Sequence, residues 1–365
     1  MKVVIISKAL VRGVYQRTLE EIVRLGDIEL SVISPPSWKE GKTILSLERR
    51  FTQGYDLLVT PIVFNGHYHF YFYPRLSTLL AEIRPEVVYV DEEPYNVAAW
   101  QALHWAASNG AGRVFYTWQN IRRRLPPPFS VIEMINYRLA NGAIAANTDA
   151  RDILASKGFA RPVWIIPPGL DPDLYFPGNG LPGPEFQVGY VGRLVPEKGV
   201  DLLIRACKSL ELPWRLSIIG DGPEREALAE VARQYDAADR VTFRGPLAST
   251  DVPAVLRELN VLVLPSRTMA NWREQFGRVL VEAMACGVPV VGSTCGEIPQ
   301  VIGEAGLIFA EGNSERLAER LAELQRDPEL RAKLARLGRD RVLQNFTIAR
   351  IAEKTLEVFR SLSKS

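Results

Sequence analysis

The sequence predicts an α/β protein made of two doubly wound domains in tandem. Short apolar runs alternate with helical patterns along the chain, which is typical of parallel βαβ units. A segment dense in proline and glycine, "PPGLDPDLYFPGNGLPGPEF", interrupts this alternation near the middle. The length of 365 residues also favours two domains over one. Because ligands bind beyond the carboxyl ends of the strands in such sheets, we expect the two domains to face a central cleft that contains the site.

The expected strands are short runs rich in β-branched residues. In the first half they are "KVVII", "IELSVI", "DLLVT", "EVVYV", "RVFYT", "GAIAA" and "VWIIP", and helical patterns cover 15–25, 94–108 and 129–140. In the second half they are "QVGYVG", "RLSIIG", "RVTFRG", "NVLVLP" and "VPVVG". The last helical pattern, over 346–365, follows the second series, and we expect it to cross back to the first domain.

Composition, net charge and cysteine content indicate what class of protein this is. Hydrophobic residues make up 47% and charged residues 24%, as in ordinary soluble proteins. The net charge of +2 favours neither nucleic acid nor an acidic partner. The cysteines and histidines lack metal-ligand spacing, so we expect no metal and a reducing, cytoplasmic environment. The "DPD" at 171–173 lies in the expected linker and is interpreted as a turn.

Two glutamates near the end of the second series suggest a binding site. In "NWREQFGRVLVEAMACGVPVV", Glu282 lies among apolar neighbours of a helix predicted over 277–285, and Glu274 precedes that helix. An ion pair with Arg278 is the simplest explanation for Glu282, worth only ~0.3–0.5 kcal/mol if exposed. It does not explain Glu274. Buried carboxylates often indicate a ligand, here one with hydroxyl groups, and the helix N-terminus would suit a phosphate.

Loops after other strands of this half carry glycines and cations. In "YVGRLVPEKG", Gly192 permits a close turn, and Arg193 and Lys198 follow it. Two cations at a strand's carboxyl end suit a diphosphate, although a solvated turn with surface cations explains this segment equally well by itself. "IIGDGPERE" is only half of a dinucleotide fingerprint, so it is weak evidence for a nicotinamide cofactor.

Together, "GRLVPEKG", "IIGDGPERE", "VTFRGPL" and "EQFGRVLVEAMACGVPVVGS" resemble the retaining glycosyltransferases of family 4, which have the GT-B fold. The pair of glutamates separated by seven residues is the most specific element. The resemblance implies a hexosyltransferase of polysaccharide biosynthesis that uses a nucleotide-diphosphate sugar, a glycan or lipid-linked acceptor, and no cofactor. It implies a Rossmann-like acceptor domain over 1–168, a linker over 169–185, and a Rossmann-like donor domain over 186–345.

The resemblance also implies roles for individual residues. Arg193 and Lys198 would hold the diphosphate and stabilise the departing nucleotide, while Glu274 would meet the donor sugar. Glu282 would bind the ribose hydroxyls. The other implied donor-binding residues are Gly13, Gly192, Gly220, Asp221, Gly222, Arg244, Gly245, Gln275, Phe276, Gly277, Arg278 and Val279.

The first half departs more from the family. Its first loop, "SKALVRGVYQ", keeps only Gly13 of the usual paired glycines, and "TWQN" has Gln119 where many members have a histidine. Gln119 and the following Asn120 are therefore expected only to hydrogen-bond on the acceptor side. Front-face displacement, in which the leaving phosphate takes the acceptor's proton, needs no histidine. Glu92 in "VDEEPYN" either binds acceptor hydroxyls or, with Pro94 at the start of a helix, complements the helix dipole; the two explanations weigh equally.

Aromatic and basic segments suggest a membrane contact at the inner face of the membrane. "GHYHFYFYPRLSTLL" is rich in aromatics, and "NIRRRLPPPF" contains three consecutive arginines. Core aromatics and a solvated basic loop are the alternative, and it is slightly favoured. For the whole chain, the alternative functions are a nucleotide-sugar epimerase of the same fold and a non-catalytic nucleotide- or glycan-binding module.

Overall fold

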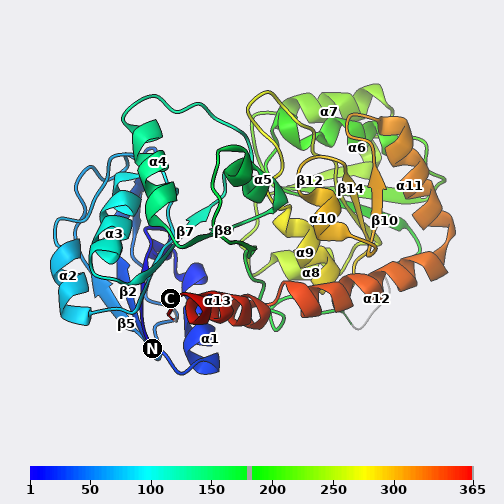
Figure 1. The fold of residues 1–365 in the computed structure, drawn as a ribbon. Coiled ribbons are helices and arrows are strands. Elements are labelled where there is room, and N and C mark those ends of the chain that lie inside the picture. Colours follow the sequence, from blue (N-terminus) through cyan, green and yellow to red (C-terminus); the bar gives the residue numbers. More distant parts are fainter. Residues whose placement is uncertain (179–182, 364–365) are drawn as a thin grey trace. The chain divides into compact units, whose positions relative to one another are not determined.

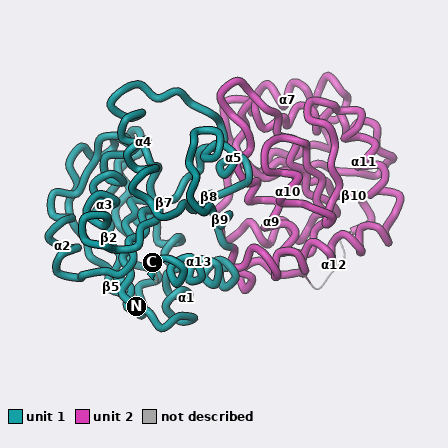
Figure 2. The backbone as a smooth tube through the Cα atoms, in the orientation of Figure 1, with its two compact units in different colours: residues 1–169, 348–365 teal, residues 170–347 magenta. Residues whose placement is uncertain are grey.

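The computed structural model describes residues 1–178 and 183–363. The chain forms two compact units, one of residues 1–169 and 348–365 and the other of residues 170–347 (Figure 2). Each unit contains a parallel sheet with helices around it (Figure 1), so the predicted α/β class is confirmed. None of the helices in the described part of the chain is long and apolar enough to cross a membrane.

The sheet of the first unit has the strand order β5-β2-β1-β6-β7-β8-β9, and its neighbouring strands are parallel. All of the strands expected in this half form, with the bounds β1 Lys2–Ile6, β2 Glu29–Ser34, β5 Asp56–Val59, β6 Val87–Val90, β7 Gly112–Thr117, β8 Gly142–Ala145 and β9 Val163–Ile165. An antiparallel hairpin of β3 (Ser37–Glu40) and β4 (Thr43–Ser46) was not predicted. Its strands are short and mostly polar, so they carry no apolar run.

Helices cover both faces of this sheet because successive strand residues point to opposite sides. Val4 and Ile6 of β1 belong to one core, and Val3 and Ile5 belong to the other. The helices of this unit are α1 Arg17–Leu25, α2 Leu76–Ile83, α3 Val97–Ser108, α4 Phe129–Leu139, α5 Thr148–Ser156 and α13 Ile348–Ser363.

Helix α13 packs within the first unit. Its buried face includes Leu356, Phe359 and Leu362, which share a core with α1 and the sheet. A Cβ on Gly26 would lie 2.6 Å from Leu356 Cδ2, and one on Gly112 would lie 2.6 Å from the Leu362 carbonyl oxygen. Glycine at these two positions therefore permits the close approach of the C-terminal helix.

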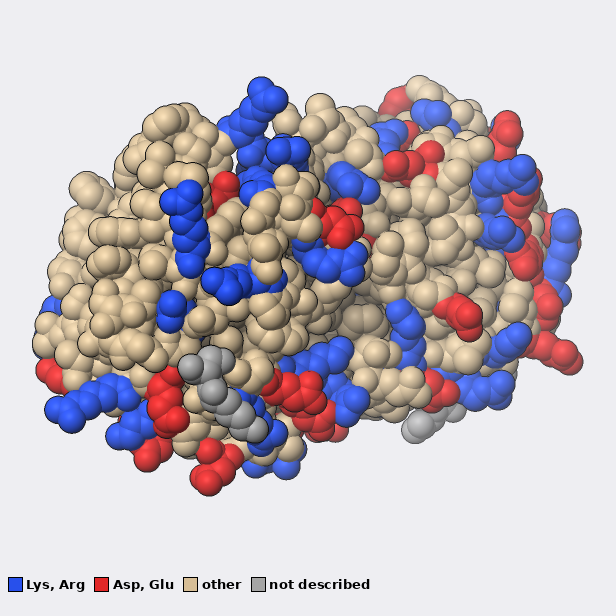
Figure 3. Space-filling model, in the orientation of Figure 1, with Lys and Arg blue, Asp and Glu red and all other residues tan. Residues whose placement is uncertain are grey.

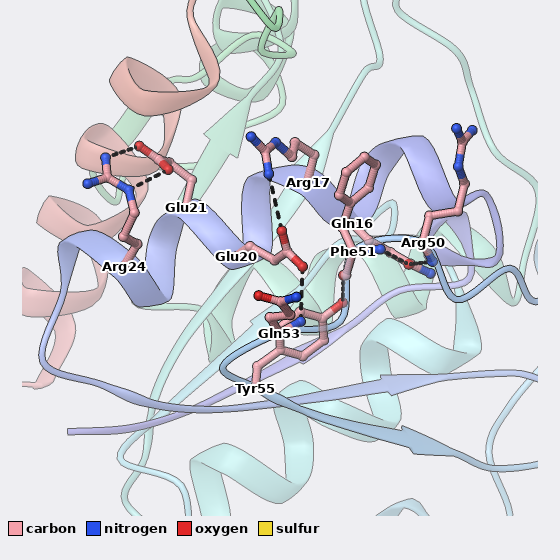
Figure 4. A network of polar contacts seen from close by, with 9 residues as sticks. All are labelled: Gln16, Arg17, Glu20, Glu21, Arg24, Arg50, Phe51, Gln53 and Tyr55. Carbon is pink, nitrogen blue, oxygen red and sulfur yellow. Dashed lines mark hydrogen bonds and ion pairs between the residues drawn. The ribbon is translucent and has the colours of Figure 1, made fainter.

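A polar network fixes the chain between β4 and β5 against α1 (Figure 4). The Gln16 amide donates to the Leu10 carbonyl at 2.9 Å and the Glu48 carbonyl at 2.6 Å, and it accepts from the Arg50 N–H at 3.1 Å. Tyr55 donates to the Phe51 carbonyl at 2.7 Å, and burial raises the pKa of Tyr55 to about 12. These bonds give partners to the Gln16 amide and the Tyr55 hydroxyl, which are otherwise withdrawn from water.

The sheet of the second unit has the order β12-β11-β10-β13-β14-β15 and is parallel throughout. Its strands are β10 Phe186–Val191, β11 Trp214–Ile219, β12 Val241–Gly245, β13 Val261–Leu264, β14 Val290–Ser293 and β15 Leu307–Phe309. Only β15 was not predicted, because three residues give too short a pattern. The helices are α6 Val200–Cys207, α7 Arg225–Gln234, α8 Val252–Leu256, α9 Arg278–Ala285, α10 Ile298–Ile302, α11 Ser314–Arg326 and α12 Pro328–Asn345.

The described part of the expected linker is packed into the second unit from Leu170 onward. Leu170 donates to the Phe346 carbonyl at 2.8 Å, and Tyr175 is only 2% exposed. Arg339 Nη1 donates to the Tyr175 carbonyl at 2.7 Å. The proline and glycine content predicted an irregular segment here. The buried Tyr175 side chain and the hydrogen bonds of Leu170 and Arg339 nevertheless attach this segment to the second unit. Residues 179–182 of the expected linker lie outside the described residues.

The strand order reverses beside β10. From β10 the chain moves to β11 and β12 on one side, and then to β13, β14 and β15 on the other. The loops after β10 and β13 therefore diverge at the carboxyl edge of the sheet, which is where doubly wound sheets bind ligands.

Candidate active site

Three glycine-containing loops form the carboxyl edge of β10, β11 and β12. The Gly192 N–H donates to the Ile219 carbonyl at 2.9 Å, and the Gly220 N–H donates to the Gly245 carbonyl at 2.8 Å. Gly220 has φ +130°, and a Cβ there would overlap the Gly192 carbonyl oxygen. A Cβ on Gly222 would overlap the Leu194 carbonyl oxygen. The predicted glycines therefore serve the packing of one loop on the next.

Lys198 and Glu274 form an ion pair beside this edge. Lys198 ends a short 3₁₀ turn after β10, and Glu274 lies between β13 and α9. The distance from Lys198 Nζ to Glu274 Oε2 is 2.6 Å, and Ser266 Oγ donates to the same oxygen at 2.9 Å. The Lys198 ammonium also lies 4.8 Å from the centre of the Trp272 ring. Among the residues that the structure describes, none hydrogen-bonds to Glu274 Oε1. That oxygen is therefore available to accept a hydrogen bond from a ligand.

The backbone of Glu274 is held from the loop after β14. Its carbonyl accepts from the Glu297 N–H at 3.1 Å. Gly296 has φ +56°, and a Cβ there would overlap the same carbonyl oxygen. The position of Glu274 is therefore determined by two loops and not by its own segment alone.

Glu282 has two protein partners on one of its oxygens. Arg278 Nε lies 2.9 Å from Glu282 Oε1, and the Tyr175 hydroxyl lies 3.2 Å from it. The ion pair considered from the sequence is therefore present, with the Glu282 side chain 12% exposed and the Arg278 side chain 48% exposed. Within the described part of the chain, Oε2 has no partner. Sequence reasoning missed Tyr175, whose only signal was an aromatic residue within a proline-rich segment.

The start of α9 presents backbone donors. Gly277 is the N-cap with φ +74°, and no side chain caps the helix. The N–H groups of residues 276–279 have no partner among the residues that the structure describes. Leu280 closes the first turn by donating to the Gly277 carbonyl at 2.8 Å. Free N–H groups at a helix N-terminus form a suitable site for an anion.

Other residues of this unit were also predicted to bind the donor, and two of them, Arg244 and Asp221, do not contact the Lys198–Glu274 pair. Arg193 is exposed, and its side chain has no ion pair in the described regions of the chain. Arg244 pairs with Glu258 at 2.8 Å on the surface, and the Asp221 carboxylate accepts from the Gly222 N–H at 2.9 Å. Neither Arg244 nor Asp221 contacts the Lys198–Glu274 pair. Gln275, which is exposed, lies in the same loop as Glu274.

Two residues predicted for ligand binding in the first unit have internal partners instead. The Gly13 N–H donates to Glu48 Oε2 at 2.9 Å, and a Cβ on Gly13 would lie 2.6 Å from Arg50 Cγ. A carboxylate at this N–H would repel a phosphate, so we remove Gly13 from the donor site. The Glu92 side chain is fully buried against the Lys8 ammonium, and it accepts from the Lys8 N–H at 3.1 Å.

The environment of Glu92 corrects both explanations considered for it. Helix α3 begins only at Val97, so Glu92 does not complement its first turn. The ammonium of Lys8 lies 5.3 Å from the Tyr71 ring centre and 5.4 Å from the Trp38 ring centre. Because both oxygens of Glu92 are bonded within the protein, it is a structural partner of Lys8 and not an acceptor-binding carboxylate.

Asp91 and Glu93, the neighbours of Glu92 in the sequence, have pKa values above their usual range. Burial raises the pKa of Asp91 to about 6, although the bond from Ser7 opposes this shift. Burial likewise raises the pKa of Glu93 to about 7, against bonds from the Thr117 hydroxyl at 2.7 Å and the Trp118 N–H at 2.8 Å.

Gln119 and Asn120 lie in the loop after β7. Lys157 Nζ donates to Gln119 Oε1 at 3.0 Å and is paired with Glu133 at 2.7 Å. Asn120 is buried, with 7% of its surface exposed. The orientation of the Gln119 amide is thus determined by a lysine that the sequence pattern did not point to.

Known proteins resemble the chain in sequence and in fold. The family described as "Glycosyl transferases group 1" matches residues 172–341, which contain Lys198, Glu274 and Glu282. The chain is 31% identical over 260 residues to D-inositol 3-phosphate glycosyltransferase from Stackebrandtia nassauensis, covering 64% of this chain and 57% of that protein. It is 31% identical over 219 residues to the GDP-mannose-dependent alpha-(1-6)-phosphatidylinositol monomannoside mannosyltransferase of Mycobacterium tuberculosis, covering 56% of this chain and 57% of the mannosyltransferase.

The chain spans about half the length of the curated relatives it matches, 57% of the first and 44% of the second. Among solved structures, Anabaena HepE in complex with UDP matches with a TM-score of 0.74 and 19% identity, covering 99% of this chain and 100% of that one. This likeness shows that the chain has the predicted GT-B fold.

Proposed function

We propose that the protein is a retaining glycosyltransferase that moves a sugar from a nucleotide-diphosphate donor to a glycan or lipid-linked acceptor. One observation carries the proposal. Glu274 and Glu282 flank the free N–H groups at the start of α9, and each has one oxygen bonded within the protein and one oxygen available. A ligand with a sugar, a diphosphate and a ribose has the groups that complement these three features in this order.

In the proposed complex, each part of the donor has its own partner. The ribose hydroxyls donate to Glu282 Oε2, and hydroxyls of the transferred sugar donate to Glu274 Oε1. The N–H groups of residues 276–279 bind the diphosphate. Lys198, held by Glu274 at 2.6 Å, and the exposed Arg193 add positive charge around it.

The proposed reaction breaks the bond between the sugar's anomeric carbon and the phosphate oxygen. The acceptor oxygen bonds to the same face of that carbon, and its proton passes to the departing phosphate oxygen. Negative charge grows on the diphosphate as the bond breaks, so Lys198 and Arg193 stabilise the transition state more than the ground state. No side chain of this chain is assigned as the base.

We also propose that transfer needs no metal ion and no cofactor. The support is that the positive charge of Lys198 and Arg193 can take the role of a divalent cation at the diphosphate. Activity should therefore persist in excess EDTA. Complete loss that manganese restores would contradict this proposal and direct attention to the aspartates at 171–173.

A turnover assay distinguishes the functions. The protein is incubated with UDP-, GDP- and ADP-sugars and a panel of glycan and lipid-linked acceptors, and release of nucleoside diphosphate is followed. A transferase releases nucleoside diphosphate and gives a product whose anomeric configuration, read by NMR, equals that of the donor. An epimerase converts one nucleotide sugar into another without requiring an acceptor, and a binding module shows binding without turnover.

We further propose that the first unit contacts a membrane surface from the cytoplasmic side. Within the aromatic segment, Tyr71 and Tyr73 are fully buried, whereas Tyr68 and Phe70 are 47% and 48% exposed. Phe64, which lies two residues before this segment, is 57% exposed. Figure 3 has few charged side chains around α2 and α3 of this unit in the view shown. Exposed aromatics near the basic run 122–124 suit an anionic interface.

Sedimentation with vesicles tests the membrane contact. The protein should co-sediment with vesicles containing anionic lipid, and Phe64→Ser with Phe70→Ser should weaken this. Equal sedimentation of the wild type and the double variant would contradict the contact while leaving the transferase proposal unaffected.

A further inference from the structure

Tyr175 contacts the glutamate proposed to bind the ribose, although 107 positions separate the two residues. Its hydroxyl lies 3.2 Å from Glu282 Oε1, and its ring is almost wholly buried, with 2% of the residue exposed. The residue comes from the segment before β10, outside the sequence pattern that contains the two glutamates.

The Tyr175 ring occupies a fixed position relative to α9. Arg339 Nη1 donates to the Tyr175 carbonyl at 2.7 Å and to the carbonyl of Ala285, the last residue of α9, at 2.8 Å. One guanidinium thereby joins the segment of Tyr175 to the helix that carries Glu282. Burial and the nearby Glu282 carboxylate raise the pKa of Tyr175, so its hydroxyl stays protonated and can donate.

The two donors on Glu282 differ in rigidity. Arg278 reaches Oε1 from the solvent side, with 48% of its side chain exposed, and an exposed pair of this kind constrains a carboxylate only weakly. Tyr175 reaches the same oxygen from the buried side. A carboxylate turns about its last side-chain bond unless something fixes it. The bond from Tyr175 therefore does most to hold Oε1, and with it Oε2, at one defined position.

We propose that Tyr175 is a positioning residue that orients Glu282 for the ribose and thereby favours ribonucleotide over 2′-deoxyribonucleotide donors. This inference rests on the proposed function, since it needs Glu282 to meet the ribose. The two adjacent hydroxyls of ribose can both donate to a fixed oxygen, whereas 2′-deoxyribose offers only one. A site built to pair with a hydroxyl discriminates strongly against an analogue that lacks it.

The test is Tyr175→Phe, which removes the hydroxyl and keeps the ring. Calorimetry gives the Kd of UDP, GDP and ADP and of each 2′-deoxy counterpart for the wild type and the variant. We expect the ribonucleotide Kd to rise about three- to tenfold, as for loss of a hydrogen bond that acts through a neighbour, with the deoxynucleotide Kd nearly unchanged. Donor KM should rise in parallel, with kcat within about twofold.

Matched variants separate positioning from a general loss of packing. Tyr235→Phe removes a hydroxyl from a partly exposed tyrosine at the end of α7 and should leave both constants unchanged. In the Glu282→Gln background, Tyr175→Phe should add little, because it acts through Glu282. Arg278→Gln, at an exposed position, should keep most of the ribose preference, and this measurement does not depend on the folding of the Tyr175 variant.

Several outcomes would overturn the inference. Equal rises of the ribo- and deoxynucleotide Kd in Tyr175→Phe would show a packing effect only. Collapse of the preference in Arg278→Gln would assign the anchoring role to Arg278. A wild type that binds nucleoside diphosphates without ribose preference would remove the inference and leave the proposed function intact, whereas a wild type that binds none would remove both.

Discussion

Lys198 and Glu274 lie 76 positions apart in the chain, yet the ammonium of one is 2.6 Å from the carboxylate of the other. They come from the loops after β10 and β13, which diverge where the strand order reverses. The sequence suggested separate roles for them, one at the diphosphate and one at the sugar. Their contact makes them a single structural unit, which the proposed mechanism places beside the bond that breaks.

A double-mutant cycle tests whether Lys198 and Glu274 act jointly. Lys198→Met and Glu274→Gln should each lower kcat about 10²- to 10³-fold, as when one donor to a developing anion is removed. The double variant should be little worse than either single variant, because each change already disrupts the same unit. Steady-state kinetics on the four proteins gives the coupling. Losses that multiply would contradict a joint role.

Glu282 should behave differently from Glu274. Its proposed contact with the ribose is present in the ground state and in the transition state alike, so Glu282→Gln should mainly raise the donor KM. Inhibition by free nucleoside diphosphate should weaken by a similar factor. Arg205→Gln, on α6, serves as a surface control that should change neither. A fall in kcat without a change in KM would show that Glu282 acts on the reacting sugar.

Gly220 should be irreplaceable for a steric reason. It has φ +130°, and a Cβ there would overlap the Gly192 carbonyl oxygen, whereas Gly312 has φ +78° with open space around its Cβ position. Gly220→Ala should therefore lower the unfolding free energy by about 2–4 kcal/mol, and Gly312→Ala by about 1 kcal/mol. Urea unfolding of both variants measures the difference. Equal destabilisation would mean that φ alone determines the cost.

The first unit should lose stability as the pH rises from about 4 to about 7. The pKa values of Asp91 and Glu93 are raised to about 6 and about 7 from 3.8 and 4.5, so the folded state binds more protons than the unfolded state in the window between these values. Their contribution to stability therefore falls from about pH 4 to about pH 7. Asp91→Asn with Glu93→Gln should flatten this fall. Thermal melts across the window test it, and parallel curves for variant and wild type would contradict it.

The sequence predicted the strands well because nearly all of them are short apolar runs that alternate with helices. It also placed Glu274 before α9, Glu282 within that helix and two cations after β10, because glycine, charge and apolar spacing occur together in short segments. The roles of these residues stay predictions. Partners brought together by tertiary folding were not predictable. Lys8 reaches Glu92 across 84 positions, and Tyr175 reaches Glu282 across 107. Gly13 and Glu92 were assigned to ligands because their protein partners leave no local pattern.

Binding of a nucleotide-diphosphate sugar by this chain is tested most directly by a thermal-shift measurement with nucleotide sugars. UDP-, GDP- and ADP-sugars are added at about 100 times the dissociation constant, where a ligand stabilises the folded protein by ~2.7 kcal/mol. We expect at least one donor to raise the Tm of the wild type, and Glu282→Gln and Lys198→Met to reduce that shift. Absence of any shift across the panel, up to millimolar donor, would contradict the claim that this chain binds a nucleotide-diphosphate sugar.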